Sequence, residues 1–234
     1  MTIHIILPTA EGGIVWATDT ALGLGGNNFA AVDKIRYIQP KNAACSSLGN
    51  HGLPIANQLR DWIADGRIDL SDSDTITRTL GHFCMAMVPS LRIDVTQPNR
   101  PAVILVANLD SAPRVYFAQV NVPVPSVTES DNLICAGDSD NPCRIFVDQY
   151  YEATHKTTGE ALLLGVHALR KAHEFKAAYI GPPNAWVGGG GVFRRLTDAE
   201  LKQCIKASEA LDDAILSAAA NFVLDTSVAP KEGA

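Results

Sequence analysis

The sequence lacks any concentration of basic residues. Its 234 residues include 19 Lys and Arg against 25 Asp and Glu, which gives a formal net charge of −6 and a pI near 5.4. Binding of nucleic-acid phosphates needs clustered lysine and arginine side chains. We therefore expect no nucleic-acid partner.

Membrane and export signals are also missing. No apolar run approaches the roughly 18 residues that are needed to span a bilayer. The N-terminus has no basic region followed by an apolar stretch and a small-residue cleavage site. These absences predict a cytoplasmic protein with no membrane partner.

Cysteine spacing offers neither a disulfide framework nor a zinc site. The five cysteines are odd in number and form no C-x-x-C pair. The six histidines show no metal-ligand spacing. We therefore predict no metal, no cofactor and a reducing compartment.

The composition that is present fits one globular domain. Hydrophobic residues make up 47% of the chain and charged residues 19%, so the chain can bury a sizeable core. No break in composition marks a linker, and low complexity is limited to the four glycines at 188–191. We predict one domain over residues 1–224, followed by a disordered tail over residues 225–234.

The N-terminal stretch has the pattern of a β-hairpin. Residues 2–7 are β-branched and apolar, residues 9–13 favour a turn, and residues 14–19 form a second strand pattern. Such a hairpin returns Asp19 to the neighbourhood of Thr2.

A segment rich in Gly and Asn, residues 22–28, follows the hairpin. Its spacing matches neither the dinucleotide-binding nor the P-loop pattern, and no helical pattern opens directly after it. We interpret it as a flexible connection and not as a phosphate-binding loop.

The remaining chain alternates runs of strands with runs of helices, which favours an α+β fold with antiparallel sheets over a βαβ succession. Two stacked sheets between two helical layers would satisfy this order. Strand patterns cover residues 34–39, 43–48, 102–108, 114–120 and 133–136, residues 181–184 form a loop, and helical patterns cover residues 53–63, 76–87, 142–151, 158–175 and 197–224.

Thr2 stands directly after Met1. Once Met1 is removed, the freed α-amine, whose pKa is about 7.7 to 8 in peptides, lies beside the threonine hydroxyl and can serve as its base. Threonine is small enough for methionine removal to be the expected outcome. A threonine that only forms part of a strand is the plainer interpretation.

Five segments occur in an order that is typical of one protein family. They are Thr2, the hairpin end at residues 15–19, the strand that begins at residues 33–38, the small-residue segment 44–49 followed by a helix, and residues 134–139 followed by two helices. Together they resemble proteasome β subunits and the HslV peptidase, including bacterial homologues of the Anbu type. The resemblance covers most of the chain.

This resemblance implies a four-layer αββα sandwich of two antiparallel sheets, the N-terminal-nucleophile hydrolase type, with threonine peptidase activity. Thr2 would be the nucleophile, Lys34 would keep its amine deprotonated, and Asp19 would orient Lys34. The backbone N–H of Gly49 would stabilise the oxyanion, and Cys45 would lie near the pocket for the substrate side chain that precedes the cleaved bond. The family pattern further implies stacked homo-oligomeric rings, peptide or unfolded-protein substrates and an ATP-dependent unfoldase.

Several residues depart from the family pattern. Family members usually carry Ser in place of Asp138, and an Asp and a Ser in the segment that here contains Ala177 and Ile180. Asp138 or Ser139 would have to supply part of that support, and the usual Arg after the hairpin is Ala21 here. These departures leave two alternatives open, a weakly active or inactive ring subunit and a small-molecule amidase on the same fold.

Single residues also have structural interpretations. Asp19 and Lys34 could form a structural ion pair at a sheet end, which would contribute little to stability if it is exposed. His4 lies on the same strand face as Thr2, and we expect a packed strand residue there and not a catalyst.

Overall fold

The structure is a computed structural model. It describes residues 2–23, 29–49, 51–94, 100–109, 112–120, 125–130, 133–137, 143–151, 156–175 and 180–221. The predicted tail over residues 225–234 therefore lies outside the described residues.

The first sheet carries the N-terminus and contains five strands in the order β10-β1-β2-β11-β12. Every neighbouring pair is antiparallel. Its strands are β1 (Ile3–Pro8), β2 (Ile14–Asp19), β10 (Ile134–Gly137), β11 (Pro183–Gly189) and β12 (Val192–Arg195).

The second sheet also has five strands, in the order β5-β6-β7-β8-β9, and is antiparallel throughout. A separate two-stranded ribbon pairs β3 with β4. The strands are β3 (Ala21–Gly23), β4 (Phe29–Ala31), β5 (Arg36–Ile38), β6 (Ala43–Leu48), β7 (Ala102–Ala107), β8 (Arg114–Gln119) and β9 (Ser126–Ser130).

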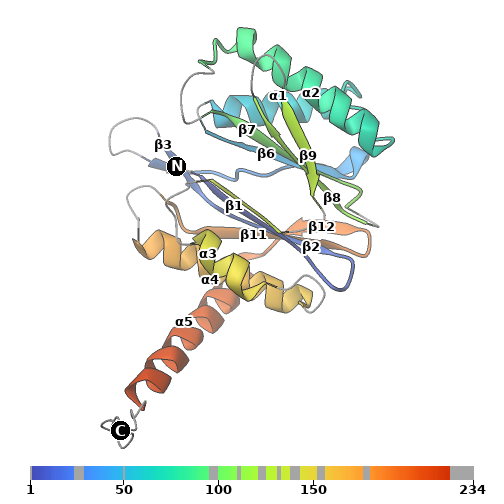
Figure 1. The fold of residues 1–234 in the computed structure, drawn as a ribbon. Coiled ribbons are helices and arrows are strands. Elements are labelled where there is room, and N and C mark those ends of the chain that lie inside the picture. The colour runs from blue at the N-terminus through green and yellow to red at the C-terminus, as the bar shows by residue number, and fades with distance from the viewer. Residues whose placement is uncertain are drawn as a thin grey trace, which may run out of the picture.

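Helices cover the outer face of each sheet, so the molecule has four layers (Figure 1). The pair α1 and α2 lies on the second sheet, and the pair α3 and α4 lies on the first. This arrangement confirms the predicted αββα sandwich. The helices are α1 (Gly52–Ala64), α2 (Ser73–Ser90), α3 (Cys143–Tyr150), α4 (Thr158–Phe175) and α5 (Asp198–Ala220), and a 3₁₀ turn spans Gln39–Lys41.

Strand alternation divides the interior into three apolar layers. In β1, Ile3, Ile5 and Leu7 pack toward α3 and α4, whereas Ile6 packs between the two sheets. Successive side chains of a strand point to opposite faces, so His4 shares the face of Ile6. His4 is therefore a polar residue in the layer between the sheets.

The C-terminal helix α5 packs on α4 over its first half and then leaves the layered body (Figure 1). Its start is fixed by a capping box, in which Thr197 accepts from the backbone N–H of Glu200 and the Glu200 carboxylate accepts from that of Thr197. Ser208 is fully buried against α4, whereas Ile215 and Leu216 are exposed. No helix within the described ranges is both long and apolar enough to cross a membrane.

Four local predictions were wrong. The segment predicted to be a flexible connection begins inside the ribbon strand β3, and residues 24–28 lie outside the described residues. The strand predicted at residues 34–39 is only β5 before the 3₁₀ turn, β11 begins at Pro183 inside a predicted loop, and β9 was missed. Proline is tolerated at the first position of a strand, so β11 can begin at Pro183. The strand β9 is polar and lies at the edge of its sheet, and its sequence therefore lacks the alternation of apolar and polar residues that marks a half-buried strand.

A glycine sets the distance between α4 and the first sheet. A Cβ at Gly165 would lie 3.1 Å from Cβ of Ala17 and 3.6 Å from Cδ1 of Leu7. The helix therefore packs on β1 and β2 without room for a side chain at this position.

We expect Gly165→Leu to lower the free energy of unfolding by about 1–3 kcal/mol, because the added side chain must displace the sheet residues. Gly159→Leu is the matched control, since Gly159 is exposed in the first turn of the same helix and its nearest neighbour is Oγ1 of Thr157 at 3.9 Å. Urea unfolding of both variants measures the difference. Equal stabilities would contradict the packing argument.

Candidate active site

Three of the residues singled out in the sequence meet at one end of the first sheet. Nζ of Lys34 lies 3.0 Å from Oγ1 of Thr2 and 2.8 Å from Oδ1 of Asp19. The antiparallel register of β1 and β2 places the end of β2 beside the start of β1. The hairpin thus returns Asp19 to Thr2, and Lys34 reaches both from the segment before β5.

The Asp19 carboxylate is fully buried and accepts four hydrogen bonds. Oδ1 accepts from the backbone N–H of Ile3 at 2.9 Å and from Lys34. Oδ2 accepts from the backbone N–H groups of Ala21 at 3.1 Å and Gly181 at 3.2 Å. Burial of a charged carboxylate is costly unless it is paired and hydrogen-bonded, and here both oxygens are saturated.

Gly181 is a site residue that the sequence did not reveal. A Cβ at this position would lie 2.3 Å from the backbone nitrogen of Ala21, so only glycine allows the loop to approach the carboxylate. Backbone donors carry no side-chain signature, and Gly181 is separated from Asp19 by 162 positions. Ala21, which departs from the family pattern, takes part through its backbone alone.

Burial changes the chemistry of Lys34. Its side chain is 7% exposed. Desolvation lowers the pKa of the Lys34 amine below its ordinary value, against the charge and hydrogen bond of Asp19, which raise it. The lysine therefore holds its proton less firmly than an exposed lysine does, while its ammonium form still donates to Thr2.

Exposure separates Thr2 from its two partners. Thr2 is half-buried, whereas Asp19 and Lys34 are buried. Thr2 therefore keeps some exposed surface, while its charged partners are shielded from water, where their interaction would be weaker. The arrangement fits a nucleophile supported from within the fold.

Gly49 follows β6 and has a φ of +81°. A Cβ there would lie 2.7 Å from the carbonyl oxygen of Arg100 and 3.0 Å from Cα of Pro101. Both the dihedral angle and the close approach require glycine. The role of its N–H as an oxyanion donor stays a prediction.

The structure does not bring Cys45 to Thr2. Cys45 is fully buried in the layer between the second sheet and α1, and its thiol lies 3.8 Å from the carbonyl oxygen of Ala56. Desolvation raises the pKa of the Cys45 thiol to about 12. Its predicted contact with substrate remains untested, and the buried position disfavours it.

The predicted outer support falls mostly outside the described residues, which exclude Asp138, Ser139 and Ala177. Gly137 is described, and a Cβ there would lie 2.1 Å from the carbonyl oxygen of Thr2. Glycine at 137 therefore lets β10 pass close to Thr2. Ile180 is fully buried in the apolar layer beneath the first sheet.

A buried histidine network lies directly behind these residues. Nε1–H of Trp16 donates to Nδ1 of His4 at 3.1 Å, and Nε2 of His4 lies 3.1 Å from Oγ of Ser46. The Ser46 hydroxyl donates to the carbonyl oxygen of Lys34 at 2.8 Å. His4 is fully buried, as expected for a packed strand residue, but its hydrogen bonds join the two sheets.

Desolvation, reinforced by the Lys34 charge, lowers the pKa of His4 from 6.5 to about 3. The ring is therefore neutral at physiological pH. Trp16 can only donate, so Nδ1 of His4 carries no proton and Nε2 does.

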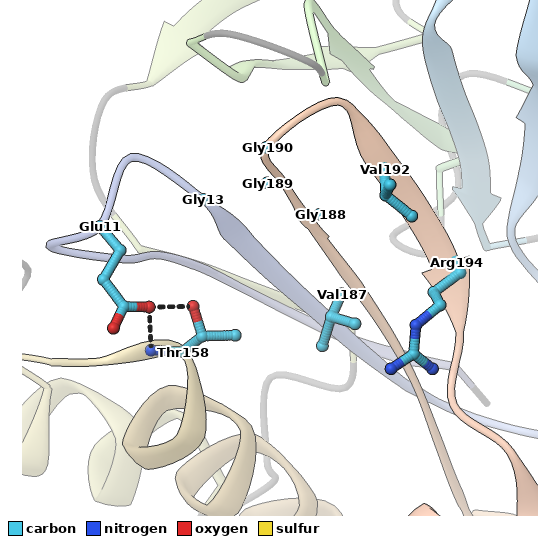
Figure 2. Close-up of a pocket in the computed structure, with 9 residues that line it drawn as sticks. All are labelled: Glu11, Gly13, Thr158, Val187, Gly188, Gly189, Gly190, Val192 and Arg194. Atoms are coloured by element: carbon cyan, nitrogen blue, oxygen red, sulfur yellow. Dashed lines mark hydrogen bonds between the residues drawn. The ribbon is translucent and has the colours of Figure 1, made fainter.

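A shallow pocket elsewhere in the molecule does not belong to this cluster (Figure 2). It has a cavity volume of about 330 Å³ and lies beside the hairpin turn, at the opposite end of β1 from Thr2. The Glu11 carboxylate inside it accepts from the hydroxyl and backbone N–H of Thr158, and Arg194 pairs with Glu200. Its polar groups are thus already engaged.

The part of the chain that the structure describes contains no set of side chains arranged as metal ligands. Within those ranges, no group of three or more His, Cys, Asp or Glu side chains is arranged to hold an ion.

Comparisons with solved structures give the same architecture. Anbu (ancestral beta-subunit) from Yersinia bercovieri has a TM-score of 0.72 at 9% identity, over 96% of this chain and 99% of that chain. The Gly-1 mutant of Anbu from Hyphomicrobium sp. strain MC1 has a TM-score of 0.68 at 15% identity, over 96% and 99%. Another Anbu structure from that strain has a TM-score of 0.67 at 15% identity, over 95% and 98%.

Sequence comparisons add nothing to this likeness, since neither a family model nor a curated protein matches the chain. At 9–15% identity the likeness shows a shared fold. The fold is thus that of these Anbu structures, and the roles of individual residues rest on the geometry of this chain.

Because Asp19 and Lys34 form a buried ion pair, we expect the stability effects of replacing them to be strongly coupled. We expect Asp19→Asn and Lys34→Met each to cost about 3–5 kcal/mol of unfolding free energy, because each leaves a buried polar or charged partner uncompensated. The double variant should cost less than the sum by roughly 0.5–3 kcal/mol. Urea unfolding of the four proteins measures the coupling, and strictly additive losses would argue against a buried pair.

The lowered pKa of His4 predicts that the folded protein loses stability in acid. Below pH 6.5 the unfolded chain protonates His4 and the folded chain does not until about pH 3, so stability is lost across that window. Between pH 7.5 and pH 5.0 the loss from this group is about 2 kcal/mol, at about 1.4 kcal/mol per pH unit. His4→Phe lacks this loss, and parallel stability curves for the two proteins would contradict the assignment.

Proposed function

We propose that this chain is a threonine peptidase that hydrolyses peptide bonds through an acyl-enzyme on Thr2 after removal of Met1. One observation carries the proposal. The Lys34 ammonium lies between the Thr2 hydroxyl and the Asp19 carboxylate, at 3.0 Å and 2.8 Å, with Thr2 the most exposed of the three.

The first half of the reaction forms an ester. The Thr2 hydroxyl gives its proton to the free α-amine and attacks the substrate carbonyl carbon. Negative charge develops on the carbonyl oxygen, where the Gly49 N–H would stabilise it. The protonated amine then passes its proton to the departing substrate nitrogen, which leaves the acyl group on Thr2.

The second half returns the free enzyme. The α-amine takes a proton from water, whose oxygen attacks the ester carbonyl, and the protonated amine then returns that proton to the departing Thr2 oxygen as the acid product leaves. Lys34 keeps the amine in its basic form, because a neighbouring positive charge lowers the pKa of an amine. The Asp19 carboxylate holds the Lys34 ammonium in place. It also accepts a hydrogen bond from the backbone N–H of Ile3, which fixes the backbone next to the nucleophile.

The site also fits a larger assembly. We propose a cytoplasmic homo-oligomeric ring in which Thr2 faces an inner chamber, with unfolded polypeptide as substrate and an ATP-dependent unfoldase as partner. The exposed apolar side chains Leu211, Ile215 and Leu216 on the projecting part of α5 support assembly, since such side chains favour contact with another protein. Native mass spectrometry measures the number of subunits.

A second candidate function is that of a non-catalytic ring subunit. It is favoured by Ile180, an apolar residue in the segment where the family pattern has polar support. This candidate predicts that Thr2→Ala leaves function in cells unchanged.

Intact mass of the purified protein should show a chain that begins at Thr2, and a peptide β-lactone should add one acyl group to that residue. Thr2→Ala should abolish the adduct. Thr2→Ser, which keeps a hydroxyl at the same position, should retain it, and Lys34→Met should slow it because the amine loses its neighbouring charge.

The pH profile gives an independent measure of the amine. The acylation rate should rise with pH around a midpoint below the value of about 7.7 to 8 for a free α-amine. A wild-type chain that begins at Thr2 and forms no adduct would sink the peptidase proposal. Cleavage of an acyl-amide with model peptides left intact would instead favour the amidase.

A further inference from the structure

The buried network of Trp16, His4 and Ser46 ends on the backbone of the lysine that contacts the nucleophile. We propose that His4 is a positioning residue for the reaction, because its neutral ring holds the Lys34 backbone at a fixed place relative to the strand that carries Thr2. This inference rests on the proposed function, in which Lys34 supports Thr2.

The direction of the hydrogen bonds is determined at each atom. The Trp16 indole has only a donor, so it donates to Nδ1 of His4, and Nε2–H of His4 is left to donate to Ser46. The Ser46 hydroxyl donates its hydrogen bond to the carbonyl oxygen of Lys34. The chain of donors thus runs one way, from Trp16 to Lys34, and every member is satisfied.

This chain crosses from one sheet to the other. Trp16 and His4 lie on β2 and β1 of the first sheet, Ser46 lies on β6 of the second, and Lys34 precedes β5. All three polar side chains of the network lack exposed surface. The direct bond from His4 ties Ser46 to β1, which begins one residue after Thr2.

The connections form a closed ring of contacts around the site. His4 lies in β1, two residues after Thr2, it contacts Lys34 through Ser46, and the Lys34 side chain returns to Thr2 at 3.0 Å. Lys34 is held at both ends, at its carbonyl by Ser46 and at its ammonium by Asp19. Apolar replacement of His4 would leave the Ser46 hydroxyl without the donor that orients it, so the hold on the Lys34 carbonyl would weaken.

The ring must stay neutral to do this. A second proton on Nδ1 would face the Trp16 N–H, which is itself a donor, and would oppose the Lys34 ammonium, the charged group that acts on the imidazole. An apolar side chain of similar size fills the space but cannot bond Ser46. Glutamine can, because its amide places a donor near the position of Nε2.

The test compares His4→Phe, Ser46→Ala, their double variant and His4→Gln in the full chain. The readout is the rate of Thr2 acylation by a peptide β-lactone, resolved into a maximal rate and a half-saturating concentration. We expect His4→Phe to lower the maximal rate about 10- to 100-fold with little change in half-saturation, since small misplacements near the reacting atoms have effects of this size. His4→Gln should recover most of the rate.

The double variant separates positioning from stability. Replacing both partners removes the unpaired Ser46 hydroxyl of His4→Phe and the unpaired Nε2–H of Ser46→Ala, so the double variant should regain part of the stability lost in the single variants, while the Trp16 N–H and the Lys34 carbonyl stay unpaired. If the rate recovers together with the stability, His4 is only structural and the proposal is wrong. A rate that stays low in a restored fold supports it.

His167→Phe is the matched control. His167 is also buried and lies 2.8 Å from a buried serine hydroxyl, that of Ser208, but this pair joins α4 to α5 away from Thr2. We expect it to lower stability without changing the acylation rate of the folded protein. An equal rate loss in both histidine variants would overturn the specific role of His4.

A measurement independent of activity separates this proposal from the peptidase proposal. The Lys34 amine can be titrated by NMR with ¹⁵N-labelled lysine, and in His4→Phe its pKa should rise toward the ordinary value of about 10.4 as the side chain loses its buried position. Absence of a wild-type adduct defeats the peptidase proposal alone. An unchanged Lys34 titration in the variant overturns the role of His4 in either case.

Discussion

The buried ion pair between Asp19 and Lys34 is the interaction on which the rest of the site depends. Two charges removed from water are tolerated only when their remaining hydrogen-bonding capacity is met, and here the carboxylate is met by three backbone donors that come from three separate segments. The pair can therefore exist only in the complete fold. Conversely, the fold brings the start of β1, the end of β2 and the loop before β11 together around one carboxylate.

The layered architecture brings these separate segments together at the site. The two sheets face each other across an apolar layer, and the hydrogen bonds from His4 to Ser46 and from Ser46 to Lys34 are polar links across it. Close approaches that only glycine permits, at Gly137 beside Thr2 and at Gly181 beside Ala21, bring backbone to the site from two further segments. The Thr2 hydroxyl is thus positioned by a frame that is built largely from main-chain contacts.

Much of the fold was open to prediction from sequence, because apolar alternation and helical spacing mark β2, β6 and α4 at the boundaries that the structure shows. The meeting of Thr2, Asp19 and Lys34 followed from the hairpin and from the family pattern. The contribution of Gly181 did not, since a backbone donor leaves no trace in a sequence. Nor did the partner of His4, because the pairing of Ser46 with it depends on how one sheet is stacked on the other.

The hydrogen bond from Ile3 to Asp19 has a consequence for how such a site can change over evolutionary time. The bond holds the peptide unit that follows residue 2, and it makes no use of the residue 2 side chain. The place of residue 2 is thereby set by its neighbour and does not depend on its own side chain. A serine or a cysteine in second position would be delivered to the same point in space, so the fold can keep its scaffold while the group at residue 2 is exchanged.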